Sequence, residues 1–127
     1  MNIVVLSGHL SSDPNVRELA SGSVLMTLEL TTKVEGAAVS VPLVWFDPPA
    51  RVAVVSGDEV RAVGTVRRRF YRAGGATQSR TEVVVAHLGK AGDKRSTAAQ
   101  RRWLDLALAD PAEAAIGPGA ANQLRST

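Results

Sequence analysis

The alternation of side chains over residues 24–31 constrains the fold more than any other feature of the sequence. The even-numbered residues of this stretch are apolar, and they are Val24, Met26, Leu28 and Leu30. A period of two is typical of a strand with one buried face and one exposed face. We therefore predict a half-buried strand whose even-numbered side chains enter the core.

Other strand-forming runs are separated by turn residues. We predict strands over residues 2–10, 38–46, 59–71 and 79–88, with a loop over residues 11–23. The third of these five strands contains Pro42, which has no N–H to donate and so belongs at an edge or a bulge. Gly74 and Gly75 permit the positive φ that a hairpin tip requires between the last two strands.

A short helix is predicted between the third and fourth strands. Asp47 has the position of an N-cap and Pro48 that of the first helical residue, and Gly57 would end the helix. Five strands with this helix form the order of an all-β OB-fold, a five-stranded Greek-key barrel that binds oligonucleotides or sugars. Another small five-stranded barrel would have the same order.

The length of 127 residues predicts one domain with an extension. We assign residues 1–90 to the nucleic-acid-binding OB-fold domain and residues 91–127 to a linker, a short helix and a disordered tail. The helix is predicted over 98–109, capped by Ser96 or Thr97, and a second cap-like start follows at 110–113. One face of the first helix contains Ala99, Trp103, Leu106, Ala107 and Asp110. This helix would dock on the protein's own barrel or on a partner.

Positive charge is concentrated in one stretch. The formal net charge is only +3, yet residues 61–80 contain no acid and six arginines, namely Arg61, Arg67, Arg68, Arg69, Arg72 and Arg80. Consecutive like charges repel one another unless an anion binds them. The distribution therefore predicts a polyanionic partner.

Four of the five aromatic residues form two adjacent pairs, Trp45-Phe46 and Phe70-Tyr71. Adjacent residues of a strand point to opposite faces, so the core needs at most one ring of each pair. Exposed rings beside arginines favour single-stranded nucleic acid, because unpaired bases stack on rings while cations contact phosphates. Alternatively, the rings pack in the core or at a subunit interface and the arginines form a solvated hairpin.

Several functional classes lack support in the sequence. The absence of cysteine excludes disulfides and thiolate metal sites, and His9 and His87 have no metal-ligand spacing. No phosphate-binding loop or catalytic signature is present. We expect no cofactor, no metal and no enzymatic activity. The apolar run at residues 3–6 is too short for a signal peptide or a membrane span, so we expect a cytoplasmic protein without membrane association.

Residues 8–30, GHLSSDPNVRELASGSVLMTLEL, resemble the N-terminal stretch of bacterial single-stranded DNA-binding proteins. Gly8, Leu10, Asp13-Pro14, Val16-Arg17 and Ser21-Gly22 are in step with that family. The segments VGTVRRRFYR and SRTEVVVAHL resemble its fourth strand, hairpin and closing strand, so the resemblance covers residues 1–88.

This resemblance implies an OB-fold that assembles as a homotetramer and coats single strands in replication, recombination and repair, associated with the nucleoid. It implies that Tyr71 and Phe46 stack bases. Two other aromatic positions of the family fall near Lys33 and Ser40, so binding would depend more on charge. The chain ends in ANQLRST, without the acidic tip through which the family recruits partners. With these departures the chain resembles a divergent or secondary paralogue of that family.

The sequence leaves two principal hypotheses. The first is sequence-tolerant binding and protection of single-stranded DNA through Arg17, Lys33, Trp45, Phe46, Arg67, Arg68, Arg69, Phe70, Tyr71, Arg72 and Arg80. The second is a primosome-type OB-fold adaptor, for which the helix over 98–109 would be the protein-docking element. A sugar-binding or enzymatic OB-fold would require a pocket chemistry that the sequence does not contain.

Overall fold

The computed structural model describes residues 1–109. The second helix and the disordered tail that we predicted after residue 109 lie outside the described residues. In chain order the elements are β1 (Val4–Leu10), β2 (Asn15–Glu18), β3 (Val24–Val34), β4 (Ala37–Phe46), β5 (Glu59–Ala73), β6 (Ala76–Lys90) and α1 (Lys94–Ala109).

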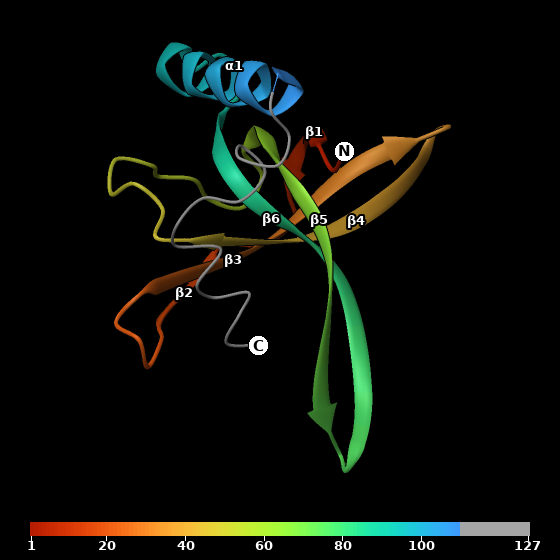
Figure 1. The fold of residues 1–127 in the computed structure, drawn as a ribbon. Coiled ribbons are helices and arrows are strands. Elements are labelled where there is room, and N and C mark those ends of the chain that lie inside the picture. Colours follow the sequence, from red (N-terminus) through yellow and green to blue (C-terminus); the bar gives the residue numbers. More distant parts are fainter. Residues whose placement is uncertain (110–127) are drawn as a thin grey trace.

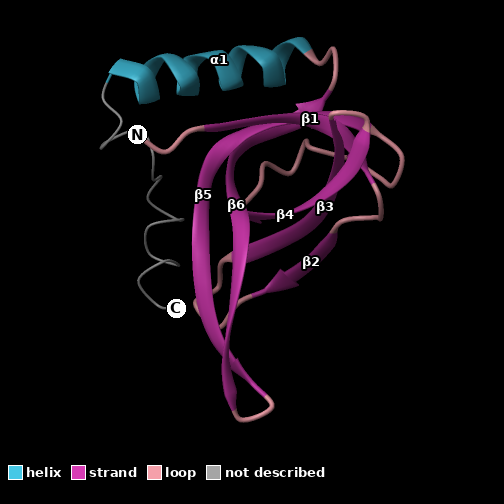
Figure 2. Ribbon diagram, turned by 90° about the vertical axis from the view of Figure 1, so that its right-hand side faces the viewer, coloured by secondary structure: helices cyan, strands magenta, loops and turns pink. Residues whose placement is uncertain are grey.

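The strands form one sheet that closes into a ring (Figure 2). Their order is β1-β5-β6-β4-β3-β2, and β1 also pairs with β3 at His9↔Thr31 and Leu10↔Leu30. All pairings are antiparallel except that of β4 with β6, which covers only Leu43↔Val83 and Val44↔Val84. The mostly β architecture agrees with the expected fold class.

The alternation in β3 is confirmed. Leu28 and Leu30 are buried and Met26 is half-buried against the same core. Pro42 pairs with Glu29 on β3, and the pairing of β4 with β6 begins only at Leu43, so the proline lies at a free stretch of strand edge as predicted. The core is apolar and comprises Leu10, Leu28, Leu30, Leu43, Trp45, Val54, Val60, Ala62, Val83, Val85 and Leu88.

Two local predictions were wrong. Four of the residues assigned to the first loop form β2, which pairs with Val24–Thr27 of β3 because Gly22, at φ 89°, closes a tight turn. The helix expected over residues 48–57 does not form, and the segment is irregular. Asp47 has φ 51° and its Oδ1 accepts the N–H of Val24, which ties it to β3 instead of capping a helix. Packing of Val52 and Val54 against the core then favours a non-helical path.

The hairpin of β5 and β6 extends well beyond the ring (Figure 1). Its register runs to Ala73↔Ala76, so Gly74 and Gly75 form a two-residue tip. Both glycines have positive φ, 60° and 79°, as a type I′ turn requires. The predicted hairpin and its tip are confirmed.

Helix α1 packs against β6 and β5, as one of the two alternatives for this helix predicted. It begins four residues earlier than expected because Asp93, and not Ser96 or Thr97, is the N-cap: its Oδ1 accepts the N–H groups of Arg95 and Ser96. Ala99 and Ala107 of the predicted face are buried, whereas Leu106 is 63% exposed. Within residues 1–109, no helix has the length and apolar character needed to cross a membrane.

A polar contact fixes α1 to the sheet. Arg61 donates from Nε to Gln100 Oε1 (3.2 Å) and from Nη2 to Thr97 Oγ1 (3.1 Å), while Gln100 Nε2 donates to the Arg61 carbonyl (3.1 Å). The first arginine of the basic stretch is therefore engaged by the protein itself.

Candidate nucleic-acid interface

Strand alternation divides the basic stretch between the two faces of the β5–β6 hairpin. We call one the groove face; it contains Arg67, Arg69 and Tyr71 of β5 with Arg80 and Glu82 of β6. We call the other the outer face; it contains Arg68, Phe70 and Arg72 of β5 with Thr77, Ser79 and Thr81 of β6. The tract that reads as one cluster in the sequence thus forms two surfaces.

The groove face continues across β3 and β4 as a groove with two adjoining depressions. Both are lined by Thr27, Val44, Arg69 and Glu82. The larger, about 300 Å³, extends towards Glu29 and Arg80, and the smaller, about 130 Å³, extends towards Arg17, Phe46 and Arg67. Leu19, Leu25, Val44 and Phe46 of the smaller depression belong to a separate apolar cluster, in which Leu25 and Val44 are buried with Val84.

Aromatic rings and guanidinium groups are stacked in this region. The guanidinium of Arg67 lies over the Phe46 ring at 5.6 Å from its centroid, and that of Arg69 lies over the Tyr71 ring at 5.1 Å. Phe46 is half-buried and Tyr71 is 39% exposed. These distances fall within the range of cation–π contacts, so each ring presents its remaining surface next to a fixed cation.

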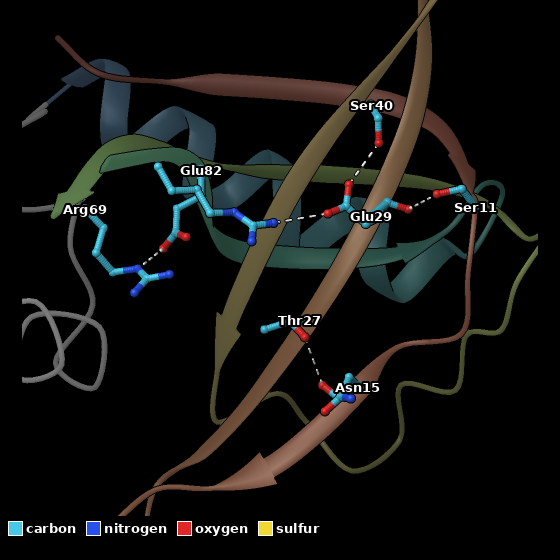
Figure 3. Close-up of polar contacts among 8 residues, drawn as sticks. Ser11, Asn15, Thr27, Glu29, Ser40, Arg69 and Glu82 are labelled. Atoms are coloured by element: carbon cyan, nitrogen blue, oxygen red, sulfur yellow. Dashed lines mark hydrogen bonds and ion pairs between the residues drawn. The ribbon is translucent and has the colours of Figure 1, made fainter. Parts of the chain in front are cut away.

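Glu82 organises the arginines of the groove. Its carboxylate is buried, and Oε2 accepts from Arg67 Nε at 2.9 Å and Nη2 at 2.7 Å, with Arg69 Nε at 3.5 Å (Figure 3 draws the Arg69 contact). Charge-assisted bonds of this kind fix planar guanidinium groups in one orientation. Nη1 of Arg67 is buried and has no hydrogen-bond partner among residues 1–109.

A second glutamate lies at the other end of the groove. Glu29 Oε1 accepts from Arg80 Nη2 at 3.1 Å, and Oε2 accepts from the Ser40 hydroxyl at 2.9 Å (Figure 3). This pair is partly exposed, with the side chains of Arg80 and Glu29 at 47% and 39%, unlike that of Glu82 with Arg67. The groove therefore has mixed charge: four arginines, Arg17, Arg67, Arg69 and Arg80, line the two depressions together with three carboxylates, those of Glu29, Glu82 and Asp13, so the formal excess is one positive charge.

His87 lies on β6 near helix α1, away from the groove. Burial lowers its pKa from the usual value, and Arg102 and Arg51 lower it further. Among residues 1–109, no group of histidine, aspartate and glutamate side chains has a geometry that could hold a metal ion.

No family model and no curated protein matches the sequence. The fold, however, has solved relatives. One is a Plasmodium falciparum SSB in complex with ssDNA, with a TM-score of 0.58 and 18% sequence identity over 66% of this chain and 85% of that chain. The likeness is one of fold, and it supports the OB-fold expected from the strand order.

The structure brings together five of the residues predicted to bind DNA. Arg17, Phe46, Arg67, Arg69 and Arg80 line the two depressions, and Tyr71 lies beside them under Arg69. Trp45 is only 4% exposed and belongs to the core, so its ring has no free face for a base. Lys33 is exposed near the β3–β4 turn and lines neither depression.

Sequence reasoning missed Glu82 and Glu29. The stretch without acids described above ends at residue 80, two residues before Glu82. Glu82 nevertheless faces Arg67 across the hairpin. The available signal was the register of the hairpin. With Gly74-Gly75 as its tip, residues whose numbers add up to 149 lie opposite one another, and Arg67 and Glu82 are such a pair. No feature of the sequence pointed to Glu29, since Glu29 and Arg80 lie on different strands and 51 positions apart in the sequence.

Proposed function

We propose that this protein binds single-stranded DNA with little sequence preference and protects it. The observation that carries the proposal is the pairing of Phe46 with Arg67 and of Tyr71 with Arg69 along one groove. Each pair offers a flat apolar surface to a base and a cation to the neighbouring phosphate. Stacking on an aromatic side chain is worth about 1–3 kcal/mol per base and is available for every base.

Unpaired strands suit this groove better than duplex DNA. A duplex encloses its base faces and offers only their edges, for which a helix or ribbon must enter the major groove. The groove is instead a sheet face whose apolar lining includes Leu19, Leu25, Val44 and Phe46. Splayed bases can lie against this lining while the phosphates follow Arg17, Arg69 and Arg80.

The fold likeness to an SSB that was solved with ssDNA supports the proposal, as does the resemblance of residues 8–30 to bacterial single-stranded DNA-binding proteins. On this basis we propose a divergent member of that family that is not an enzyme and acts as a homotetramer. Its work would be in replication, recombination or repair, at the nucleoid in the cytoplasm.

The deciding experiment is a titration of the full chain with single-stranded and double-stranded oligonucleotides of equal length at two salt concentrations. We expect binding to the single strand to be much tighter and to weaken steeply with salt. If four phosphates are neutralised per subunit, the slope of log K against log salt is about −3. Equal binding of both forms, or binding of neither, would overturn the proposal. Mass determination on the same sample tests the tetramer.

One observation favours a second role as a protein adaptor. Leu106 and Leu108 of α1 are 63% and 61% exposed, although the helix is docked through Ser96, Ala99, Gln100 and Ala107. The two leucines flank the buried Ala107 on different sides of the helix, so a partner protein could contact either one without displacing the helix. Replacing both with serine should leave oligonucleotide binding unchanged and abolish recruitment of a partner, whereas an unchanged partner complex would reject the adaptor role.

A further inference from the structure

The outer face of the hairpin has positive charge without any carboxylate. Arg68 donates from Nε and Nη2 to Ser79 Oγ at 3.3 and 3.1 Å, and Arg72 donates from Nη2 to the Gly75 carbonyl at 3.0 Å. Neither arginine forms an ion pair within residues 1–109. On the groove face, by contrast, Glu82 and Glu29 partly neutralise the arginines.

The outer face also presents the most exposed aromatic ring of the described chain. Phe70 is 59% exposed, and the guanidinium of Arg68 lies 5.6 Å from the centroid of its ring. The geometry repeats that of Arg69 with Tyr71 on the groove face. From Phe70 to Ala73 every residue of β5 is exposed, and Phe70 belongs to neither apolar cluster of the described residues, so core packing does not explain an apolar side chain there.

The two faces of the hairpin lie back to back. Phe70 and Tyr71 are consecutive residues of β5 and point to opposite sides of the strand pair. A strand stacked on Tyr71 in the groove would have to pass around the hairpin edge before one of its bases could contact Phe70. A short oligonucleotide therefore occupies one face or the other, and the outer face is a separate surface.

We propose that the outer face binds a second segment of single-stranded DNA, so that one hairpin holds two segments on opposite sides. This inference rests on the proposed function of the groove. The occupant follows from the chemistry. Two guanidinium groups without a carboxylate partner and the hydroxyls of Thr77, Ser79 and Thr81 suit phosphates, and the exposed part of the Phe70 ring suits a base. A protein that holds two segments brings separate strands together and favours their pairing.

The first experiment counts oligonucleotides per chain. Isothermal titration with an oligothymidylate of about eight nucleotides, within the span of one OB-fold, gives a stoichiometry that does not depend on the oligomeric state. We expect two oligonucleotides per chain for the unaltered protein, and one for Arg68→Gln/Phe70→Ala. The matched variant Arg69→Gln/Tyr71→Ala should instead weaken the groove site by at least about tenfold and leave the outer site.

The second experiment measures bridging. Energy transfer between donor-labelled and acceptor-labelled oligothymidylate, which cannot pair with each other, reports two strands held on one protein. The outer-face variant should lose most of the transfer that arises within a chain and should retain groove affinity. Unchanged stoichiometry and transfer in that variant would overturn the second site while leaving the groove proposal intact.

A change of oligomeric mass in the outer-face variant, with stoichiometry unchanged, would also overturn the second site, because Phe70 would then serve contact between copies. Failure of the unaltered protein to bind any oligothymidylate would overturn both proposals. The outer-face exchange concerns two exposed residues, so that variant should fold; in the groove variant Arg69 is half-buried beside Glu82, and thermal unfolding verifies the fold of both variants.

Discussion

Arg67 and Glu82 face each other across β5 and β6, with Arg67 Nη2 2.7 Å from Glu82 Oε2 and almost no solvent at the carboxylate. Removal of one partner leaves the other buried and unpaired, which typically costs about 3–5 kcal/mol. We expect Glu82→Ala to lower the free energy of unfolding by that order, measured by urea denaturation. The control is Glu29→Ala, which breaks the exposed pair with Arg80 and should cost less than about 1 kcal/mol. Equal losses would contradict the structural role of Glu82.

The rings of the groove should carry a large share of the binding free energy. Phe46→Ala combined with Tyr71→Ala should weaken binding to oligothymidylate by about 2–4 kcal/mol, since each ring stacks one base. Fluorescence anisotropy at fixed salt measures the loss. Val55→Ala, an exposed valine in the segment between β4 and β5, is the matched control and should bind normally. A double variant with unchanged affinity would show that the rings do not stack bases.

The docking of α1 requires glycine at position 89. A Cβ at this position would overlap the Oγ and Cβ atoms of Ser96. Gly89→Ala should therefore displace the helix and speed amide hydrogen exchange over residues 94–109. In the double variant Gly89→Ala/Ser96→Gly the overlapping atoms are removed, so protection should return in large part. If Gly89→Ala alone leaves the exchange of α1 unchanged, the close packing is not required.

Stability should fall at mildly acidic pH because of His87. Burial, followed by Arg102 and Arg51, lowers the pKa of His87 in the folded state. As the pH falls through the unfolded value of about 6.5, the unfolded chain takes up a proton that the folded chain does not, so the folded state loses stability. His87→Gln should remove this part of the pH dependence in thermal unfolding between pH 5 and 8, whereas His9→Gln at an exposed site should retain it.

Local patterns in the sequence predicted five of the six strands because each of those five buries side chains of one face; the four residues of β2 are all exposed, so this strand had no such pattern and was missed. The alternation in β3, the edge position of Pro42 and the Gly74-Gly75 tip follow from properties of the residues themselves. The helix predicted over residues 48–57 was wrong. Asp47, Pro48 and Gly57 are typical helix-capping residues, but the packing of Val52 and Val54 on the core outweighs their effect. Propensity is a weak guide where tertiary contacts compete with it.

The candidate site was predictable only in part. Residue types and alternation indicated that Phe70 and Tyr71 would face opposite ways, and the structure agrees. Trp45 enters the core and Phe46 lines the groove because of the way β4 is oriented in the sheet. The sequence of two adjacent aromatic residues does not reveal which of them faces inward. Neutralisation of the groove arginines by Glu82 and Glu29 depends on contacts between strands and was invisible to a count of charges along the chain.

The parallel seam between β4 and β6 has a mechanical consequence. It consists of two residue pairs, Leu43↔Val83 and Val44↔Val84, and beyond Val83 towards the tip β6 pairs only with β5. Beyond Val83 the distal arm of the hairpin is joined to β3 by the ion pair of Arg80 with Glu29, so a tilt of the arm would break that pair while the ring of strands stayed closed. Such a tilt would change the width of the groove that the hairpin borders.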